Sequence, residues 1–144
     1  MGKLVCGVGF NDKTKPTWVD GKNVKEYALW QHMLARCFSE KYQTRYPTYK
    51  GCNVSDNFLN YSFFYDWCQE QIGFGKVDEK GRSWCLDKDL LFVGNKTYSE
   101  TTCVFVPNEI NLFSLIVVTL EVNTLLVFVS QTTWQVQGTM HCKR

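Results

Sequence analysis

The stretch between residues 84 and 111 constrains the fold of this chain more than any other. Residues 84–91 read as a β-strand that carries Asp87 and Asp89, and residues 94–102 form a polar loop. A second strand over residues 103–106 leads into the first turn of a helix that reaches Asn111. We expect carboxylates at the end of one strand to face an amide on the following helix, where together they could hold a divalent metal ion.

Upstream of this stretch, apolar and aromatic residues recur at helical spacing in two segments. Residues 24–38 place Tyr27, Trp30, Leu34 and Cys37 on one face, with Asn23 or Asp20 available as the N-cap. A second helix is predicted to begin at Ser55 and to end before Gly73. Its apolar stripe consists of Phe58, Tyr61, Tyr65, Cys68 and Ile72. Such aromatic helices pack into a core.

The bulk composition fits one folded domain without a strong global attraction for nucleic acid. The 144 residues are 44% hydrophobic and 15% aromatic, enough for a substantial core, and the formal net charge is only +2. The seven cysteines are odd in number and follow no signal peptide, so we interpret them as buried free thiols. Without a Cys-x-x-Cys pair, a structural zinc site is not expected.

Local basic residues are the candidates for contact with DNA. Residues 39–53 interleave cations with tyrosines, a pattern that can grip a nucleic-acid backbone, although tyrosines of such a loop can equally cover a core. Lys25 and Arg36, on the first predicted helix, could contact phosphates or could simply belong to a solvated helix face. The candidate DNA-binding residues are Lys25, Arg36, Lys41, Arg45, Lys50 and Lys96.

The composition changes abruptly after residue 111. Residues 112–144 contain two strongly β-prone runs, and Glu121 and Asn123 interrupt the apolar sequence, which argues against a membrane span. We therefore divide the chain into residues 1–111, the domain that contains the central stretch, and residues 112–144, an atypical hydrophobic tail. One hypothesis is that a shift of the coding frame produced this tail. Translating the coding DNA in its other frames tests that hypothesis.

Two strands followed by a helix, with metal ligands at the strand end and on the helix, are the ββα-metal arrangement of nicking nucleases. The candidate metal ligands are Asp87, Asp89 and Asn111, and the candidate catalytic residues are Asp87, Lys88 and Asn95. Lys88 occupies the position expected for a general base, which is usually a histidine. A lysine with an ordinary pKa is protonated at neutral pH, so contact with phosphate or pairing with a carboxylate is the better interpretation of Lys88.

A set of ordered segments also resembles bacteriophage HNH-type, homing-endonuclease-like proteins, over about residues 7–111. The segments are Tyr27-x-x-Trp30-x-x-Met33-Leu34-x-Arg36-Cys37, Tyr46-Pro47-Thr48-Tyr49, Phe58-x-x-Tyr61, Leu86-Asp87-Lys88-Asp89, Gly94-Asn95-Lys96-x-Tyr98-Ser99 and Cys103-x-Phe105-Val106-Pro107. The resemblance implies double-stranded DNA as the ligand, a Mg²⁺ or Mn²⁺ ion, phosphodiester cleavage, and a phage protein in the cytoplasm of a bacterial host. Members of the family often carry a C-terminal Apetala-type DNA-binding domain, which is not recognisable after Asn111. The resemblance therefore implies that residues 1–111 are an HNH-like nuclease or DNA-binding domain, and that residues 112–144 are a frame-shifted or remodelled remnant of the C-terminal DNA-binding domain.

The expected fold is α+β: two aromatic-rich helices packed with a degenerate ββα-metal unit, followed by a β-prone tail. Three functions stay open. The first is a metal-dependent DNA endonuclease with a degenerate active site. The second is a DNA-binding descendant without catalysis. The third is a phage interaction protein that inhibits a host defence complex through aromatic surface.

Overall fold

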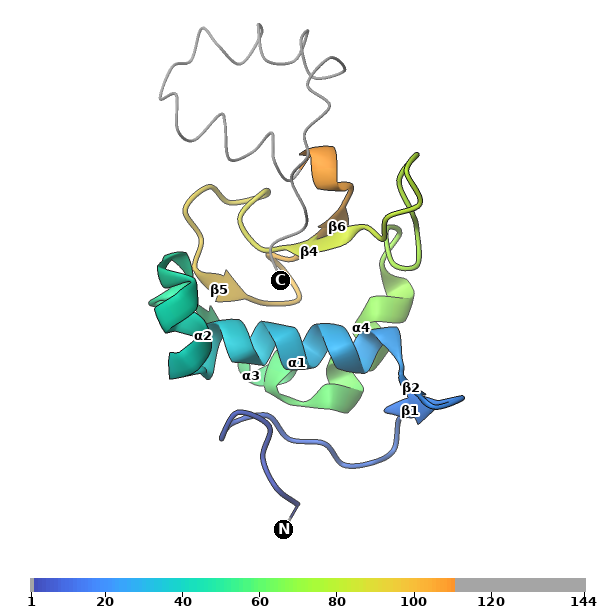
Figure 1. The fold of residues 1–144 in the computed structure, drawn as a ribbon, viewed down its shortest axis with the longest axis vertical. Coiled ribbons are helices and arrows are strands. Elements are labelled where there is room, and N and C mark those ends of the chain that lie inside the picture. The colour runs from blue at the N-terminus through green and yellow to red at the C-terminus, as the bar shows by residue number, and fades with distance from the viewer. Residues whose placement is uncertain (1, 111–144) are drawn as a thin grey trace, which may run out of the picture.

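The computed structural model describes residues 2–110, and these form a mixed α+β fold (Figure 1). The predicted α+β class is therefore confirmed. Five helices and three two-stranded sheets make up the described part. The helices are α1 (Lys25–Phe38), α2 (Glu40–Arg45), the 3-10 helix η1 (Pro47–Tyr49), α3 (Asp56–Leu59) and α4 (Tyr61–Glu70). The strands are β1 (Trp18–Val19), β2 (Lys22–Asn23), β3 (Asn53–Val54), β4 (Cys85–Asp87), β5 (Thr97–Tyr98) and β6 (Val104–Val106).

Helix α1 follows its predicted bounds closely and buries the predicted face. Trp30 and Leu34 are fully buried, and Cys37 lies one turn further along the same face. The Trp30 indole Nε1 donates a hydrogen bond to the Phe58 carbonyl at 2.8 Å, which links α1 to α3. The predicted N-cap was wrong, because the extended residue that precedes α1 is Val24, without a side-chain cap.

The second predicted helix is two helices, with a break at Asn60. Asn60 has an extended backbone, and its Oδ1 accepts the Ser62 N–H at 2.9 Å, so it caps α4. The break admits Phe10 of the N-terminal segment, whose backbone bonds to Leu59 and Tyr61 at 2.8 and 2.9 Å. The single helix was therefore an incorrect prediction. Ile72, placed in its core stripe, lies beyond α4 and is 84% exposed.

The basic segment over residues 39–53 is largely helical rather than an open connection. Ser39 caps α2 by accepting the Tyr42 N–H at 3.3 Å, and η1 follows directly. Tyr49 is buried, and its ring lies 5.9 Å from that of Tyr42. Two of the tyrosines thus pack against the core, as the core-covering alternative predicted.

The antiparallel strand pair of the central stretch forms, but its first strand is shorter than predicted. β4 ends at Asp87 rather than at residue 91, so Asp89 lies beyond the strand. β4 and β6 are antiparallel, with Leu86 opposite Phe105 and Asp87 opposite Val104. After Pro107, residues 108–110 are helical. Between these strands, β5 pairs in parallel with β3 rather than with β4, a contact that the sequence did not indicate.

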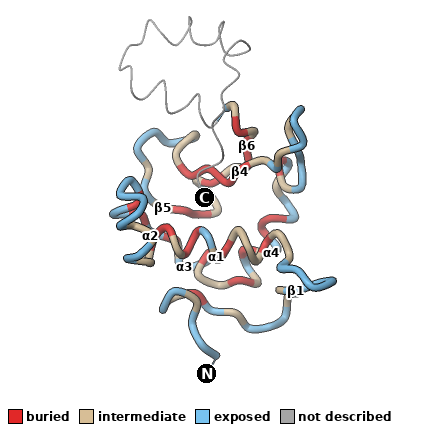
Figure 2. Tube along the Cα trace, in the orientation of Figure 1, coloured by how far each residue is buried: buried red, intermediate tan, exposed pale blue. Residues whose placement is uncertain are grey.

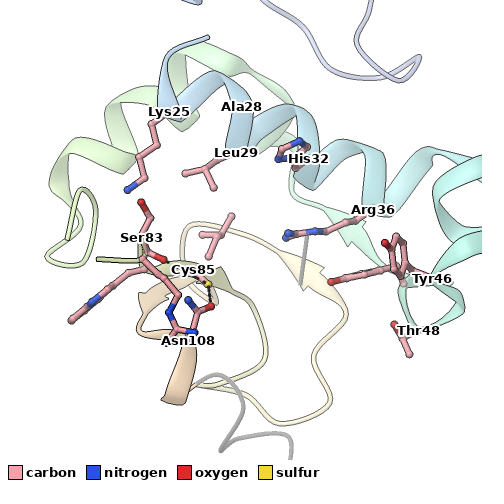
Figure 3. Close-up of a pocket in the computed structure, with 14 residues that line it drawn as sticks. Lys25, Ala28, Leu29, His32, Arg36, Tyr46, Thr48, Ser83, Cys85 and Asn108 are labelled. Atoms are coloured by element: carbon pink, nitrogen blue, oxygen red, sulfur yellow. Dashed lines mark hydrogen bonds between the residues drawn. The ribbon is translucent and has the colours of Figure 1, made fainter. Parts of the chain in front are cut away.

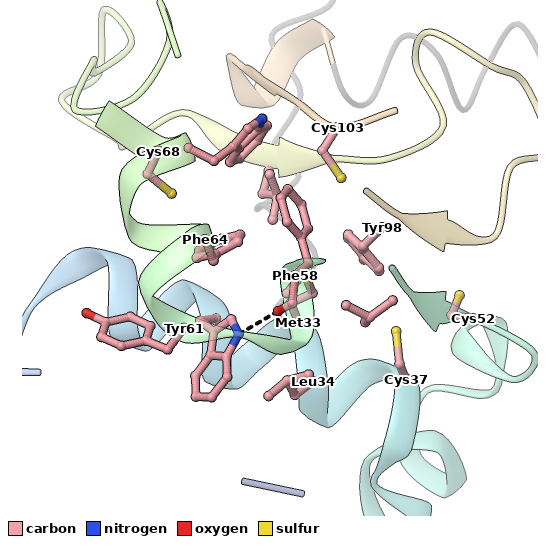
Figure 4. Close-up of a cluster of buried hydrophobic side chains, with 14 of the residues drawn as sticks. Met33, Leu34, Cys37, Cys52, Phe58, Tyr61, Phe64, Cys68, Tyr98 and Cys103 are labelled. Atoms are coloured by element: carbon pink, nitrogen blue, oxygen red, sulfur yellow. Dashed lines mark hydrogen bonds between the residues drawn. The ribbon is translucent and has the colours of Figure 1, made fainter. Parts of the chain in front are cut away.

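An aromatic cluster joins the helices to this strand pair (Figure 4). Phe58 meets Trp67 edge-on at 4.8 Å between ring centroids, and Trp67 lies 5.8 Å from Phe105 of β6. Figure 2 shows buried residues along α1, α4, β4 and β6. Aromatic rings at these distances add attraction beyond the burial of their area, so the cluster fixes β4 and β6 relative to the helices.

The cysteines differ in their environments. Cys37, Cys52, Cys68 and Cys103 are buried free thiols, as predicted. Burial raises the pKa of both Cys37 and Cys103 to about 12, which keeps these thiols protonated and unreactive at neutral pH. Cys85 is disulfide-bonded, so the free-thiol prediction was wrong there.

The predictions for the C-terminal part of the chain concern residues after 110. The boundary at residues 111 and 112 and the β-prone tail lie outside the described residues. Within residues 2–110, none of the helices combines the length and the apolar character that a membrane crossing requires.

Candidate functional site

A cleft of about 1000 Å³ separates α1 from β4 and the helical turn that follows β6 (Figure 3). One wall is a second face of α1, which carries Lys25, Leu29, His32 and Arg36, and the other is the segment over residues 82–86 together with Asn108. The η1 corner, with Tyr46 and Tyr49, closes one end of the cleft. Trp30 and its neighbours occupy a different face of α1, which packs into the core.

The cleft is lined by basic side chains and not by acidic ones. Lys25, His32 and Arg36 project from α1, and Arg82 comes from the approach to β4. None of the described residues that line the cleft is an aspartate or glutamate. A concave surface with one sign of charge concentrates counter-ions and attracts ligands of the opposite sign.

Lys25, Arg36 and Arg82 are each held in position by neighbouring side chains. The Lys25 ammonium lies 5.0 Å from the centre of the Phe74 ring, and burial lowers its pKa. Arg36, in the floor, donates through Nη1 to the Tyr98 hydroxyl at 3.4 Å and stacks over Tyr49 at 5.6 Å. Contacts of this kind orient the cations before any ligand arrives.

Arg82 is held by two carboxylates. Its Nε lies 2.7 Å from Asp78 Oδ2, and its Nη2 pairs with the Glu109 carboxylate. The pair with Glu109 ties the loop before β4 to the helical turn after β6, so Arg82 has a structural role at the edge of the cleft.

Asp87, Lys88 and Asp89 lie beside the floor of the cleft, around a small cavity of about 30 Å³ that shares Arg36 and Tyr49 with it. Lys88 is buried and pairs with Asp89, with 3.1 Å between Nζ and Oδ2. Its ammonium also lies 5.7 Å from the centre of the Tyr98 ring. The structure thus shows the carboxylate pairing that the sequence favoured for Lys88.

The Asp87 carboxylate serves the backbone that follows it. Its Oδ1 accepts the N–H groups of Asp89 and Leu90 at 2.9 and 2.7 Å. Burial raises the pKa of Asp87, and the nearby charge of Asp89 raises it further, against the lowering effect of the two N–H groups. Asp87 is therefore both a turn-forming residue and one half of a crowded carboxylate pair.

Asn95 closes the same loop from its other end. Its Nδ2 donates to the carbonyls of Lys88 and Thr97, both at 2.7 Å, and its Oδ1 accepts the Thr97 N–H at 3.2 Å. The expected role of Asn95 was to orient a catalytic base. In the structure its polar atoms clamp the two strands of a loop together.

The described residues do not complete a site for Mg²⁺ or Mn²⁺. Asp87 and Asp89 are oxygen donors that suit such ions, but one oxygen of Asp87 is committed to two N–H groups and Asp89 is paired with Lys88. Within residues 2–110 no group of three or more His, Cys, Asp or Glu side chains is arranged to hold a metal ion. The third predicted ligand, Asn111, lies outside the described residues.

The predicted DNA-binding residues fall into two groups. Lys25 and Arg36 come together in the cleft, while the others are exposed on α2, at the end of η1 or beside β5. Lys96 donates to the Thr48 carbonyl at 3.2 Å, and Arg45 stacks over Tyr46 at 5.5 Å. This places Lys96 and Arg45 at the η1 end of the cleft. The remaining two, Lys41 and Lys50, are exposed and do not line it.

His32, Arg82 and Trp84 line the cleft and were not predicted to do so. His32 could have been found from its spacing, because it lies seven residues after Lys25 and four before Arg36, on one face of a helix. The sequence carries no comparable signal for Arg82 and Trp84, whose positions depend on the pairing of β4 with β6.

Comparison of the chain with models of protein families, with characterised proteins and with solved structures found no match. The arguments about function therefore rest on the residues and their geometry.

Proposed function

We propose that this chain is an HNH-like, phage-encoded protein that binds double-stranded DNA along the basic cleft and does not cut it. The observation that carries the proposal is the lining of the cleft, where Lys25 and Arg36 lie with the aromatic side chains of Tyr46, Tyr49 and Trp84. Arg82 also lines the cleft, but its charge is paired with Asp78 and Glu109. Phosphate contacts by cations supply most of the affinity of proteins for DNA. The resemblance to HNH-type proteins, whose ligand is duplex DNA in the bacterial cytoplasm, points the same way.

Binding without cutting is favoured by the state of the carboxylate pair. Cleavage in the HNH manner needs a base that takes a proton from water and ligands that hold a divalent ion at the scissile phosphate. Lys88 is paired with Asp89, and Asp87 caps the turn that follows it. Asp87 is therefore engaged by backbone N–H groups of the protein itself, and Lys88 and Asp89 are engaged by each other.

Incubation with supercoiled plasmid tests both parts of the proposal. The wild-type protein is expected to retard the plasmid in a gel while leaving it supercoiled, with Mg²⁺, with Mn²⁺ or with a chelator. The matched control is Asp87→Ala. Metal-dependent nicking by the wild type that disappears in this variant would overturn the non-cutting part and support a metal-dependent endonuclease. The absence of any retardation would overturn DNA binding itself.

A second candidate function is supported by an exposed aromatic hairpin. Trp18 and Val19 of β1 are 61% and 51% exposed, on a hairpin turned by Asp20 and Gly21. This surface suits a phage interaction protein that inhibits a host defence complex. Two results together would favour this second function. A defined host defence complex would co-purify with the wild-type protein but not with Trp18→Ser, and the wild-type protein would leave plasmid DNA unretarded.

A further inference from the structure

The loop between β4 and β5 presents three consecutive large apolar side chains to solvent. Leu91, Phe92 and Val93 are 54%, 56% and 69% exposed. Figure 2 shows this exposed segment just before β5. We call residues 91–93 the apolar tip. Single exposed apolar residues are common, whereas a contiguous exposed set marks a surface that meets a partner.

The base of the loop is held from both sides. Asp87 Oδ1 accepts the N–H groups of Asp89 and Leu90, which fixes the residues directly after β4. On the other side, the Asn95 side chain donates to the carbonyls of Lys88 and Thr97. A further backbone bond, Asn95 N–H to the Phe92 carbonyl at 3.0 Å, closes the turn itself. The apolar tip is thus pre-organised, which lowers the entropic cost of inserting it into a partner.

The surroundings of the apolar tip are basic on the side of η1. Lys96 follows the tip, is exposed, and reaches Thr48 of η1 at 3.2 Å. Exposed Arg45 and Lys50 flank η1 in the sequence. Cations beside apolar side chains suit a partner that is anionic outside and apolar inside, which describes the phosphates and stacked bases of duplex DNA.

We infer that the apolar tip is a wedge that enters duplex DNA at a base step, with Phe92 as the leading side chain, and that it kinks the duplex. This inference rests on the proposed function, and it assigns the protein a way of deforming the DNA that the cleft holds. Apolar wedges enter most readily at pyrimidine–purine steps, where stacking is weakest. The residues that resemble a catalytic set, Asp87 and Asn95, would then serve to display the wedge.

The test uses a duplex that carries 2-aminopurine at a central TA step and a donor–acceptor dye pair at its ends. The full-length wild-type chain is expected to raise the 2-aminopurine fluorescence and to shorten the distance between the dyes. Phe92→Ala is expected to abolish both signals and to weaken binding by about tenfold, the loss expected for one stacked aromatic side chain. The dependence of binding on salt should not change, because no cation is lost. The matched control is Ile72→Ala, which removes another exposed apolar side chain.

The possible failures are distinguishable. Salt-dependent binding by the wild type without a fluorescence or distance change would overturn the wedge and leave DNA binding intact. The absence of any binding would overturn both. If sedimentation shows that the wild type self-associates, that Phe92→Ala abolishes this, and that the variant binds DNA like the wild type, the apolar tip is a protein-docking surface and the wedge is overturned.

Discussion

Asp87 and Asn95 hold the two ends of the loop between β4 and β5. Between them they make five hydrogen bonds that the loop backbone would otherwise lack. A hydrogen bond to a partly buried backbone group contributes modestly when made and costs more when its partner is removed. At the scale of single residues, the role that the structure shows for Asp87 and Asn95 is to fix the backbone of the loop between β4 and β5.

Asn95→Ala is expected to destabilise the fold by about 1–3 kcal/mol, because it removes the side-chain donor to the Lys88 carbonyl and one of the two donors to the Thr97 carbonyl. Urea denaturation followed by circular dichroism measures the free energy of unfolding. Asn23→Ala, in an exposed strand, is the control and should change it little. Equal stability of Asn95→Ala and the wild type would contradict the loop clamp.

Asp87→Asn is expected to stabilise the protein at neutral pH, since it removes a buried charge beside Asp89 and keeps the Oδ1 acceptor. The folded pKa of Asp87 is raised, so the folded wild type binds more protons than the unfolded chain between the two pKa values. Wild-type stability therefore falls as pH rises from about 4, the unfolded pKa, through the folded one.

The measurement is the free energy of unfolding of both proteins from acid to neutral pH, with a chelator present. The advantage of Asp87→Asn should grow as pH rises and vanish in acid. A difference that is constant across this range would show that the Asp87 charge is not destabilising.

Among the elements, the N-terminal segment determines where the aromatic helices divide. Phe10 bonds to the backbone on both sides of Asn60, and Gly9 packs directly on α1. A Cβ on Gly9 would lie 2.9 Å from two Trp30 ring atoms and would clash with Leu34 Cδ1. This close approach explains a glycine here without any demand on its φ angle.

Gly9→Ala is accordingly expected to destabilise the protein by about 1–3 kcal/mol through overpacking. The control is Gly2→Ala, whose added methyl would meet no atom within 4 Å. Thermal unfolding of the two variants and the wild type measures the effect. If Gly9→Ala unfolded at the wild-type temperature, the segment would not be packed on α1 as described.

Helix α1 could be predicted from the sequence because its apolar spacing is local. The break between α3 and α4 could not, because it depends on Phe10, far away in the chain. The parallel pair β3–β5 was missed for a related reason: strands of two residues carry no periodic signal, and their pairing joins Asn53 to Thr97.

For the molecule as a whole, the basic cleft is the feature that a net charge of +2 conceals. Its lining comes from residues between 25 and 108, and the carboxylates of Asp87 and Asp89 face the neighbouring small cavity instead. The sequence could name Lys25 and Arg36 as candidates, but only the packing of α1 against β4 shows that they share one surface. The α+β class, in contrast, followed from local patterns alone.

The most direct test of the account is the affinity for a fluorescent duplex of Lys25→Glu and Lys22→Glu, measured by anisotropy over a range of salt concentrations. Both variants change the charge equally, but Lys25 lines the cleft whereas Lys22 lies in the exposed β1–β2 hairpin. We predict that Lys25→Glu weakens binding about tenfold or more and lowers the salt slope by about one, while Lys22→Glu stays near the wild type. Equal effects of the two substitutions, or none from Lys25→Glu, would contradict binding of DNA along the cleft.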